Sequence, residues 1–411
     1  MTILVNVPVP SGTDVATIGP PRLLAGLDAF ARLDLGTHLY THGQLPGADL
    51  PLLLGYLDAS LIAGRGGAGF SLAGKLRAMA TGPRHIVVNG TESEPASRKD
   101  RVLLLRTPHL VLDGALVLAA AVHALSITVA VHDERSAASV QAAIGERGDA
   151  RGVTVRIIAG GFVSGEARAV VRALRGGPAV PPGRRIPPTA QGVLLANVET
   201  FAQVALLMRL GPARFAATGT STEPGTALVT VGGAVARPGV MEIPIGTALG
   251  VVLNTAQAAD PQAVVVGGYH GSWLAPAPWV RLSREGVAAA GGTFGAGVVL
   301  VVGPETCARG ELARVCGSLA GESTRQCGPC RFGLPALATD VNALVAGHPA
   351  AVSGALGHAR SVYGRGACAH PDGSARFVTS AVQVLGEEIA RHLAYGGCGR
   401  QVLGQLPVGG N

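Results

Sequence analysis

The sequence predicts an α/β protein in which a large domain with a parallel sheet precedes a small β-rich domain and a helical domain. Between about residues 55 and 222, short β-branched runs alternate with alanine- and leucine-rich stretches, as in a parallel sheet with helices on its faces. A linker is predicted at 219–225, followed by two strands around a turn at 237–239. Helix-compatible segments extend from about Pro304. The predicted domains are residues 1–222, 223–302 and 303–411.

β-Branched residues place strands of the first domain at 86–88, 127–131 and 153–158. The apolar segment 114–131 is interrupted by polar side chains, whereas a membrane-spanning helix needs about 20 apolar residues. It is therefore predicted to form a buried helix that ends near Ala124 and a strand at 126–131. The proline-rich run 178–188 is predicted to be a loop, because proline disfavours helices and central strands.

The composition and net charge exclude some classes of protein and of binding partner. Hydrophobic residues make up 48% of the chain and charged ones 14%, which excludes extensive disorder. The net charge of +7 comes from scattered arginines without a basic run, so nucleic acid is not an expected partner. A basic surface does suit an acidic electron-transfer partner such as a ferredoxin. The first residues, 1–5, show no export signal, which predicts a cytoplasmic protein.

The most informative segment is a glycine loop at 64–70, followed by an acidic turn at 89–95. Glycines without a Cβ allow a bulky phosphorylated cofactor to approach the backbone closely. Lys75 follows the loop and can neutralise a phosphate, and the strand at 86–88 delivers the acidic turn. Together these segments predict a cofactor site.

The glycine loop, the acidic turn and the run 99–101 resemble the FMN-binding part of the flavoprotein subunit of respiratory complex I and of related NAD-linked hydrogenases and formate dehydrogenases. The resemblance implies a Rossmann-like FMN-binding domain at 1–222, a β-grasp (ubiquitin-like, SLBB) domain at 223–302 and a helical iron–sulfur domain at 303–411. Thr91 stands at the family's aspartate, which alters one contact. Asp100 is expected to be structural, as a helix cap.

Two further segments match the family. Gly165 and Glu166 lie in a glycine-rich turn where the family's second glutamate is Ala167, and Asn197 lies in an Asn-Val-Glu-Thr run. Asn197 either contacts the cofactor, the preferred interpretation, or caps the following helix. The resemblance implies Glu92 and Glu94 as catalytic residues. The implied cofactor-binding residues are Gly64, Arg65, Gly66, Gly67, Phe70, Lys75, Asn89, Glu92, Ser93, Glu94, Gly165, Glu166 and Asn197.

All six cysteines lie after residue 306, and such clustering points to a metal site rather than a disulfide scaffold. The resemblance implies that Cys327, Cys330 and Cys368 hold one iron–sulfur cluster, whereas Thr324 stands at the position of the first cysteine ligand. Cys398, flanked by glycines, is the expected replacement. The alternatives are [4Fe–4S] with an outside ligand, [3Fe–4S], no cluster, or a Cys₄ zinc site. His370 is a weaker ligand candidate, and Cys316 is expected to be a buried apolar residue.

The implied function is electron transfer between NAD(P)H and a one-electron carrier through FMN and one cluster. The nucleotide site is altered, because Phe70 remains but Leu76 and Thr189 stand where the family has aromatic residues. Ala167 removes an acid and Arg168 adds a cation, which favours tolerance of NADPH. A relay subunit that has lost NAD(P)H binding and a subunit without cofactors are the alternatives. Expected partners are other electron-transfer subunits or a ferredoxin-like protein, with membrane contact only through them.

Overall fold

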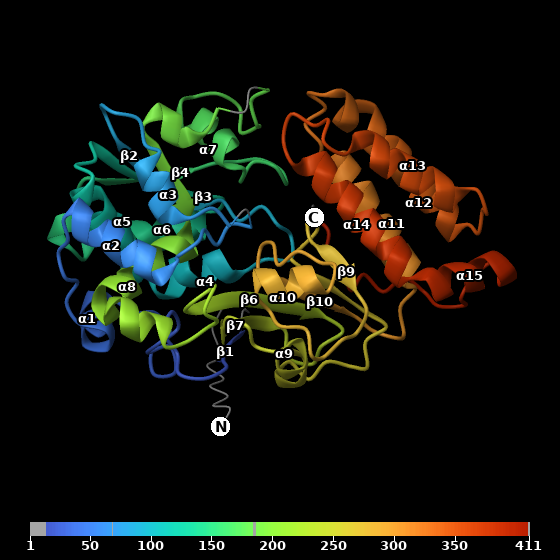
Figure 1. Ribbon diagram of the computed structural model, residues 1–411, viewed down its shortest axis with the longest axis horizontal. Coiled ribbons are helices and arrows are strands. Elements are labelled where there is room, and N and C mark those ends of the chain that lie inside the picture. The colour runs from blue at the N-terminus through green and yellow to red at the C-terminus, as the bar shows by residue number, and fades with distance from the viewer. Residues whose placement is uncertain (1–13, 68, 184–185, 410–411) are drawn as a thin grey trace.

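The computed structural model describes residues 14–409 except 68, 184 and 185. The N-terminal residues on which the expectation about an export signal rests lie outside this range. In Figure 1, helices surround a parallel sheet at one end of the molecule, a second sheet lies below the centre, and the C-terminal helices stand at the other end.

The first sheet contains four strands in the order β4-β3-β2-β5, and every neighbouring pair is parallel. This confirms the predicted parallel α/β architecture. The strands are β2 (His85–Gly90), β3 (Ser126–Val131), β4 (Val153–Ile157) and β5 (Val193–Asn197).

The two faces of this sheet pack against different helices. Ile86 and Val88 join the large core formed with α5 (Pro108–Ala121) and α8 (Val198–Ala216). Val87, between them, faces the smaller core that includes α7 (Ala167–Leu174). This alternation follows from the two-residue period of a strand. The strand at 126–131 agrees with the prediction, and the preceding helix ends at Ala121, three residues before the expected Ala124.

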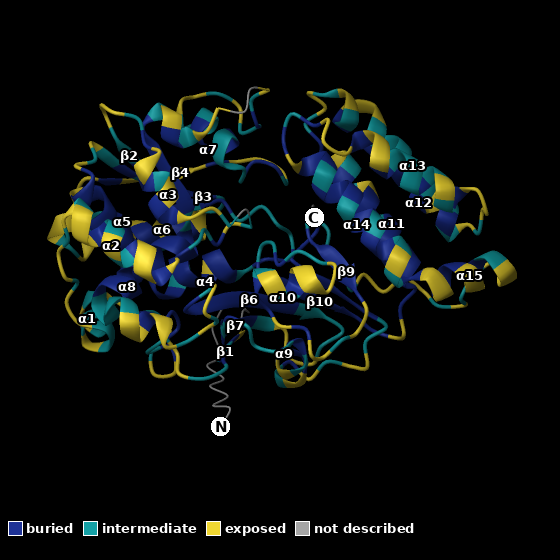
Figure 2. Ribbon diagram, in the orientation of Figure 1, coloured by how far each residue is buried: buried dark blue, intermediate teal, exposed yellow. Residues whose placement is uncertain are grey.

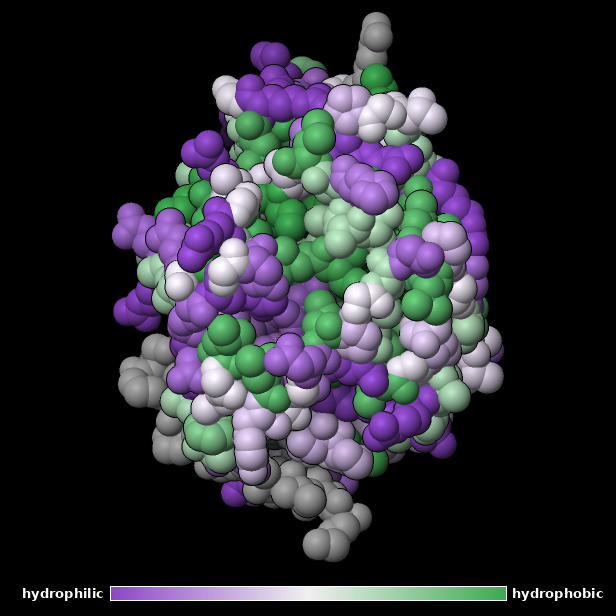
Figure 3. Space-filling model, turned by 90° about the vertical axis from the view of Figure 1, so that its left-hand side faces the viewer, coloured by the Kyte–Doolittle hydropathy of each residue, from purple (hydrophilic) through white to green (hydrophobic). Residues whose placement is uncertain are grey.

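Shorter elements complete this part of the chain. The helices are α1 (Leu35–His42), α2 (Leu50–Ser60), α3 (Leu72–Arg77), α4 (Lys99–Arg106) and α6 (Glu134–Gly145), and the short turns are η1 (Gly148–Ala150) and η2 (Pro188–Gln191). Figure 2 shows that the helices bury one side and expose the other. Large apolar side chains, including Tyr40, Leu52 and Leu61, are exposed at this end. Apolar side chains also gather across the middle of the face in Figure 3.

The second sheet has the order β1-β7-β6-β10-β8-β9. The predicted pair of strands around 237–239 is confirmed, because β6 and β7 are antiparallel neighbours. The edge strand β1 (Asp14–Thr17) pairs in parallel with β7. The N-terminal segment, expected in the first domain, thus extends the second sheet. The other elements are β6 (Thr226–Gly233), β7 (Gly239–Pro244), α9 (Leu249–Thr255), β8 (Ala263–Val266), β9 (Ser272–Leu274), α10 (Arg284–Ala289) and β10 (Val298–Val302).

The C-terminal helices pack on one face of this sheet. The Trp273 backbone N–H on β9 donates to Ser380 Oγ at 3.0 Å, and the rings of Tyr269 and Phe377 lie 5.5 Å apart. Both contacts join the β8–β9 region to α14. The elements are α11 (Ala308–Gly321), η3 (Pro329–Gly333), α12 (Leu334–Val345), α13 (Ala351–Val362), α14 (His370–Val384) and α15 (Gly386–Tyr395).

Within the described part of the chain, no single helix has both the length and the apolar character needed to cross a bilayer. The helices α4 and α5, which are bent by 92° relative to each other, are long and apolar enough only when they are taken together. Nearly all of α5 is buried among other elements.

Candidate functional site

The motif segments meet at the carboxyl edge of the parallel sheet, where ligands bind in open α/β folds. The glycine loop lies between α2 and α3 and is closed by a 2.8 Å hydrogen bond from Gly64 N to Phe70 O. A Cβ on Gly66 would meet Asn197 Cβ at 3.4 Å, which places the loop against the end of β5. The acidic turn follows β2, and Gly165 lies in the turn after β4.

The acidic turn and the Gly165 turn are in direct contact. Asn89 Nδ2 donates to Gly165 O at 2.9 Å. A Cβ on Gly165 would come within 2.5 Å of Thr91 O and 2.7 Å of Ser93 Oγ. Real Cβ atoms do not approach so closely, so a glycine is required where these two turns meet.

The glycine loop fits the phosphate of a flavin nucleotide. Gly66 is exposed, and Gly67 has φ +94°, a conformation that glycine adopts without strain. Lys75 is partly buried behind the loop, where its Nζ donates to Leu195 O at 3.0 Å. Burial lowers the pKa of Lys75, because a cation loses hydration there. A bound phosphate would supply the negative charge that this position lacks.

The two large side chains of the loop point in different directions. Arg65 is 6% exposed, and its guanidinium lies 3.8 Å from Glu199 and bonds to Thr226 O. Its side chain therefore links α8 to the second sheet, and a role of Arg65 in cofactor binding stays a prediction. Phe70 is 66% exposed, which leaves its ring open to a ligand.

A buried ionic network that the motif assignment did not identify lies beneath the site. Lys99 Nζ contacts Asp100 Oδ1 at 2.7 Å, Asn197 Oδ1 at 2.9 Å and Glu199 Oε2 at 3.1 Å. Burial acts to lower the pKa of Lys99, but the two carboxylates outweigh it and raise the pKa. Removing one member would leave a buried charge uncompensated. All four residues lie in the family motifs of the sequence, so the motifs were the signal from which the network could have been predicted.

The structure gives three predicted site residues helix-capping or ion-pairing contacts, and a contact of Asn197 with the cofactor stays a prediction. Asn197 caps α8 by accepting from Glu199 N at 3.1 Å and also contacts Lys99, so its side chain is held within the fold. Asp100 pairs with Lys99 instead of capping a helix. Glu92 takes that position, because its carboxylate accepts from the backbone N–H groups of Asp100 and Arg101 at the start of α4. A catalytic role for Glu92 does not fit these contacts.

The site raises the pKa of the Glu94 carboxyl group into the neutral range. Its Oε2 accepts from Tyr269 N at 2.9 Å, whereas its Oε1 is buried and has no hydrogen-bond partner among the described residues. Burial raises the pKa of Glu94 from 4.5 to about 7. Although the residue as a whole is only half-buried, the burial of Oε1 accounts for this direction.

The raised pKa of Glu94 predicts a pH-dependent effect of Glu94→Gln. Because the pKa of Glu94 is higher in the folded protein, folding favours the protonated acid. The contribution of Glu94 to the free energy of unfolding is therefore complete below its pKa in the unfolded chain, near 4.5, and is lost as pH rises through about 7. The uncharged glutamine avoids that loss. The free energy of unfolding of Glu94→Gln relative to the wild type should therefore be higher at pH 8 than at pH 5, by roughly 1–3 kcal/mol.

Chemical unfolding at the two pH values measures this difference. Glu134→Gln, which removes a carboxylate from an exposed position on α6, is the matched control. An equal effect of Glu94→Gln at both pH values would contradict the perturbed pKa.

Glu166 caps α7, and its charge acts on Cys368, which precedes α14. Its carboxylate accepts from Arg168 N at 3.1 Å and from Arg168 Nε at 2.8 Å. Burial raises the pKa of Cys368, and the nearby charge of Glu166 adds to that effect. The charge of the predicted flavin turn therefore acts on a predicted cluster ligand.

Cys327, Cys330 and Cys368 come together at the end of α11. Burial raises the pKa of Cys330 to about 12, and the adjacent Cys327 and Cys368 act in the same direction. His370, two residues after Cys368, hydrogen-bonds through Nε2 to Leu319 O, 2.9 Å away, near the last turn of α11. Three thiols that interact with one another are a donor set that suits an iron–sulfur cluster.

Cys398 does not join these three thiols, and its assignment to the same cluster is corrected. Its sulfur lies with those of Cys307, the N-cap of α11, and with Glu388 and His392. Helix α11 has 14 residues, so its two ends are roughly 20 Å apart. The tail runs back past the start of α11, since Cys307 N donates to Gln401 O at 2.8 Å. The Cys₄ zinc alternative that included Cys398 fails for the same reason.

The other candidate ligands have different roles. His370 Nδ1 lies 3.0 Å from His270 Nε2, so both its ring nitrogens are occupied. Cys316 is enclosed by apolar side chains of α11, α12 and α14, as expected. Thr324 is partly buried, and its Oγ1 accepts from Gln326 Nε2 at 3.0 Å. Cys327, Cys330 and Cys368 are thus the cysteines available to the cluster in the described range.

Two direct contacts connect the cysteine loop to the flavin-side turns. Phe162 N donates to Glu322 Oε2 at 2.9 Å, and Gln326 Nε2 donates to Pro181 O at 3.2 Å. Glu322 follows α11, whereas Phe162 and Pro181 flank α7. Figure 1 shows α7 facing the C-terminal helices across the top of the molecule.

Comparison with protein families gives two matches. Residues 57–206 match the Nuo51 FMN-binding domain, and residues 311–392 match the NADH-ubiquinone oxidoreductase-F iron–sulfur binding region. The second range contains Cys327, Cys330 and Cys368 but excludes Cys398, in agreement with the placement of the sulfur atoms.

Individual relatives extend the similarity over most of the chain. The F subunit of the NADH-quinone oxidoreductase of Mycobacterium tuberculosis is 30% identical over 369 residues, which cover 82% of this chain and 83% of that protein. The alpha subunit of the NAD-reducing hydrogenase HoxS of Cupriavidus necator is 32% identical over 53% of this chain and 40% of its own length. The air-oxidized crystal structure of an NAD⁺-reducing [NiFe]-hydrogenase superposes with a TM-score of 0.82 at 26% identity, covering 93% of this chain and 68% of that chain.

Proposed function

Because the chain belongs to the family of NADH-quinone oxidoreductase F subunits, oxidoreductase subunits that bind FMN and iron–sulfur, we propose that it transfers electrons between NAD(P)H and a one-electron carrier. The observation that carries this proposal is the contact between the flavin-side turns and the cysteine loop. Phe162 N donates to Glu322 Oε2, and Gln326 Nε2 donates to Pro181 O. A short path between the two cofactor sites is what electron transfer requires.

Separate groups of residues would bind the flavin phosphate, hold a proton and ligate the cluster. The backbone of Gly66 and Gly67 would receive the phosphate, and Lys75 would neutralise it. Bound FMN supplies acceptance of a hydride and release of single electrons. Glu94, with a pKa of about 7, would hold or release a proton at Oε1 near neutral pH. Cys327, Cys330 and Cys368 would hold the cluster, with no fourth cysteine.

We also propose a division of the chain into three domains. The strands after residue 225 have the order β7-β6-β10-β8-β9, with β10 parallel to β6. Counted within residues 223–302, this is the order second, first, fifth, third, fourth, which supports a β-grasp (SLBB-like) domain. The FMN-binding domain would then occupy 1–222, apart from β1, and the iron–sulfur domain 303–411.

A partner would receive electrons beside the cysteine loop. Phe332, two residues after Cys330, is 68% exposed, and Tyr363 is 60% exposed. The Arg331 guanidinium lies 5.5 Å from the centre of the Phe332 ring. Exposed aromatic and basic side chains favour an acidic protein partner, such as a ferredoxin-like protein or another electron-transfer subunit.

Anaerobic mixing with NADH or NADPH tests the function. Loss of the flavin absorbance with either nucleotide is the expected result. A flavin that stays oxidised with both would favour the alternative, a relay subunit that has lost nucleotide binding. That alternative has its own support, because Leu76 and Thr189 are buried and offer no surface to an adenine.

We expect the rates of flavin reduction with NADH and NADPH to differ by less than about 10-fold, or 1.4 kcal/mol. The reason is a hollow of about 680 Å³ beside α7, lined by Arg168, Arg172 and Arg175 among other residues. Arginines favour a 2′-phosphate, whereas an acid would repel it. Arg172→Gln should slow reduction by NADPH more than reduction by NADH, and a strong NADH preference of the wild type would count against this site.

A further inference from the structure

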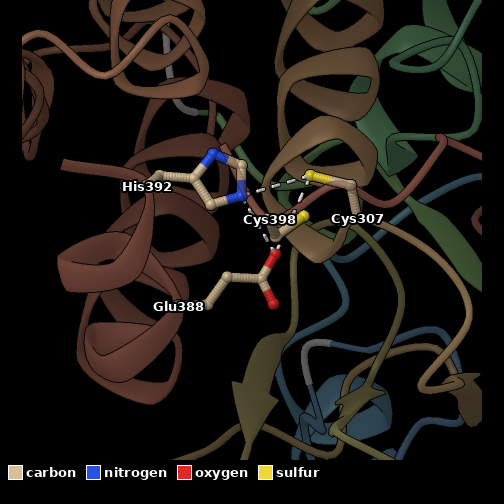
Figure 4. Close-up of side chains that lie close together, drawn as sticks. All are labelled: Cys307, Glu388, His392 and Cys398. Atoms are coloured by element: carbon tan, nitrogen blue, oxygen red, sulfur yellow. Dashed lines mark hydrogen bonds and ion pairs between the residues drawn. The ribbon is translucent and has the colours of Figure 1, made fainter. Parts of the chain in front are cut away.

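A second group of metal-ligating side chains lies at the start of α11, away from the proposed cluster. It consists of the sulfurs of Cys307 and Cys398, a carboxylate oxygen of Glu388 and a ring nitrogen of His392. All four atoms lie within 4.8 Å of one another. Figure 4 shows the four side chains pointing toward a common centre from three separate segments.

The distances match those around a single tetrahedral ion. Cys307 Sγ lies 3.7 Å from His392 Nε2 and 3.8 Å from Glu388 Oε1, and these last two atoms are 3.8 Å apart. Zinc bonds of about 2.0–2.3 Å at tetrahedral angles put neighbouring ligand atoms roughly 3.3–3.8 Å apart. The observed spacing therefore needs only small adjustments to enclose one ion.

The elements that carry these ligands are already held in place. Glu388 and His392 are four residues apart on α15 and share one face. Arg400 Nη2 donates to Glu388 Oε2 at 2.9 Å, which leaves Oε1 directed at Cys307. Beyond Cys398, Gly404 N donates to Glu311 Oε1 at 2.7 Å and anchors the tail on α11. Such outer contacts orient the ligands of natural metal sites.

A buried cation beside the group lacks hydrogen-bond partners within the described part of the chain. Arg309 is 1% exposed, and none of its three guanidinium nitrogens has a hydrogen-bond partner among the described residues. Its electrostatic neighbours are Cys307, Glu388 and Cys398. Two thiolates, one carboxylate and a neutral imidazole around a divalent ion carry a net charge of about −1. The buried Arg309 cation would therefore lie beside an anionic site.

We propose that Cys307, Glu388, His392 and Cys398 bind one zinc ion that fastens α15 and the C-terminal tail to the start of α11. Mixed sulfur, nitrogen and oxygen donors suit zinc, whereas a cluster would require thiolates. Four protein ligands leave no open position, so the role is structural. Ion binding displaces the thiol protons of Cys307 and Cys398 to solvent, and nothing is oxidised or reduced.

Metal analysis of the full-length protein, purified without oxygen from zinc- and iron-supplied cells, tests this site. The expected result is about one zinc per chain, with X-ray absorption showing two sulfur neighbours at about 2.3 Å. Cys398→Ser and the double variant Cys398→Ser/His392→Asn should lower zinc affinity by at least about 10–100-fold. Both variants should keep their iron and flavin, which also shows that they fold.

Cys330→Ser is the reciprocal control, because it should lose iron and keep zinc. This pair separates failure of the zinc site from failure of the proposed electron-transfer function. Wild-type protein that binds no zinc would overturn the proposal, as would zinc retained in the double variant. A Cys307–Cys398 disulfide in the intact protein, or loss of iron in Cys398→Ser, would overturn it as well.

Discussion

Replacing Gly67 with leucine should yield protein that has lost most of its FMN. Gly67 has φ +94°, and a side chain costs roughly 1–2 kcal/mol in this left-handed region. A Cβ there would also contact Gly295 at 3.6 Å, so the rest of a leucine side chain would be forced toward the loop's neighbours. The loop must then change conformation where the phosphate would sit. We expect FMN affinity to fall by at least about 10-fold, or 1.4 kcal/mol.

Flavin absorbance per chain after gel filtration, followed by FMN titration of the apoprotein, measures the effect. Gly152→Leu is the matched control, because a Cβ there meets nothing within 4 Å and its φ is not positive. Lys75→Glu should also deplete the flavin, since it places an anion beside the phosphate. Full occupancy in both Gly67→Leu and Lys75→Glu would remove the basis for this site.

Replacing Cys330 with serine should abolish the iron–sulfur cluster while the flavin remains bound. Cys330 is 2% exposed, and its thiol lies beside Cys327 and near Cys368. Loss of an outer contact of a metal ligand costs about 10–100-fold in affinity, and loss of the ligand itself should cost more. Reduction of a one-electron acceptor should fall by at least about 100-fold by the same reasoning.

Iron content and electron paramagnetic resonance of the anaerobic protein test this result. Cys316→Ala is the control, because Cys316 is enclosed by apolar side chains away from the other thiols. Thr324→Cys should have the opposite effect and raise iron retention, since it supplies a fourth thiolate at the position of the missing ligand. An unchanged cluster signal in Cys330→Ser would exclude the three-cysteine site.

Charge burial accounts for the main differences between the expected and the observed roles of individual residues. Glu92, expected to be catalytic, caps α4, and Asp100, expected to be a cap, pairs with Lys99. The sequence contains the acidic residues in the right motifs, but a carboxylate's role depends on which donors the fold brings within hydrogen-bonding distance. Arg65 shows the same point, because its side chain turns away from the loop toward Glu199.

The sequence by itself determined the parallel sheet, the family and the two cofactor segments. The β-branched runs at 86–88 and 126–131 depend on local side-chain chemistry, and the glycine loop and the Cys-x-x-Cys spacing are local as well. Only the tertiary structure decided that β1 joins the second sheet and that Cys398 lies with Cys307. Both are pairings between segments far apart in the chain, set by how the domains pack, and residue spacing carries no information about them.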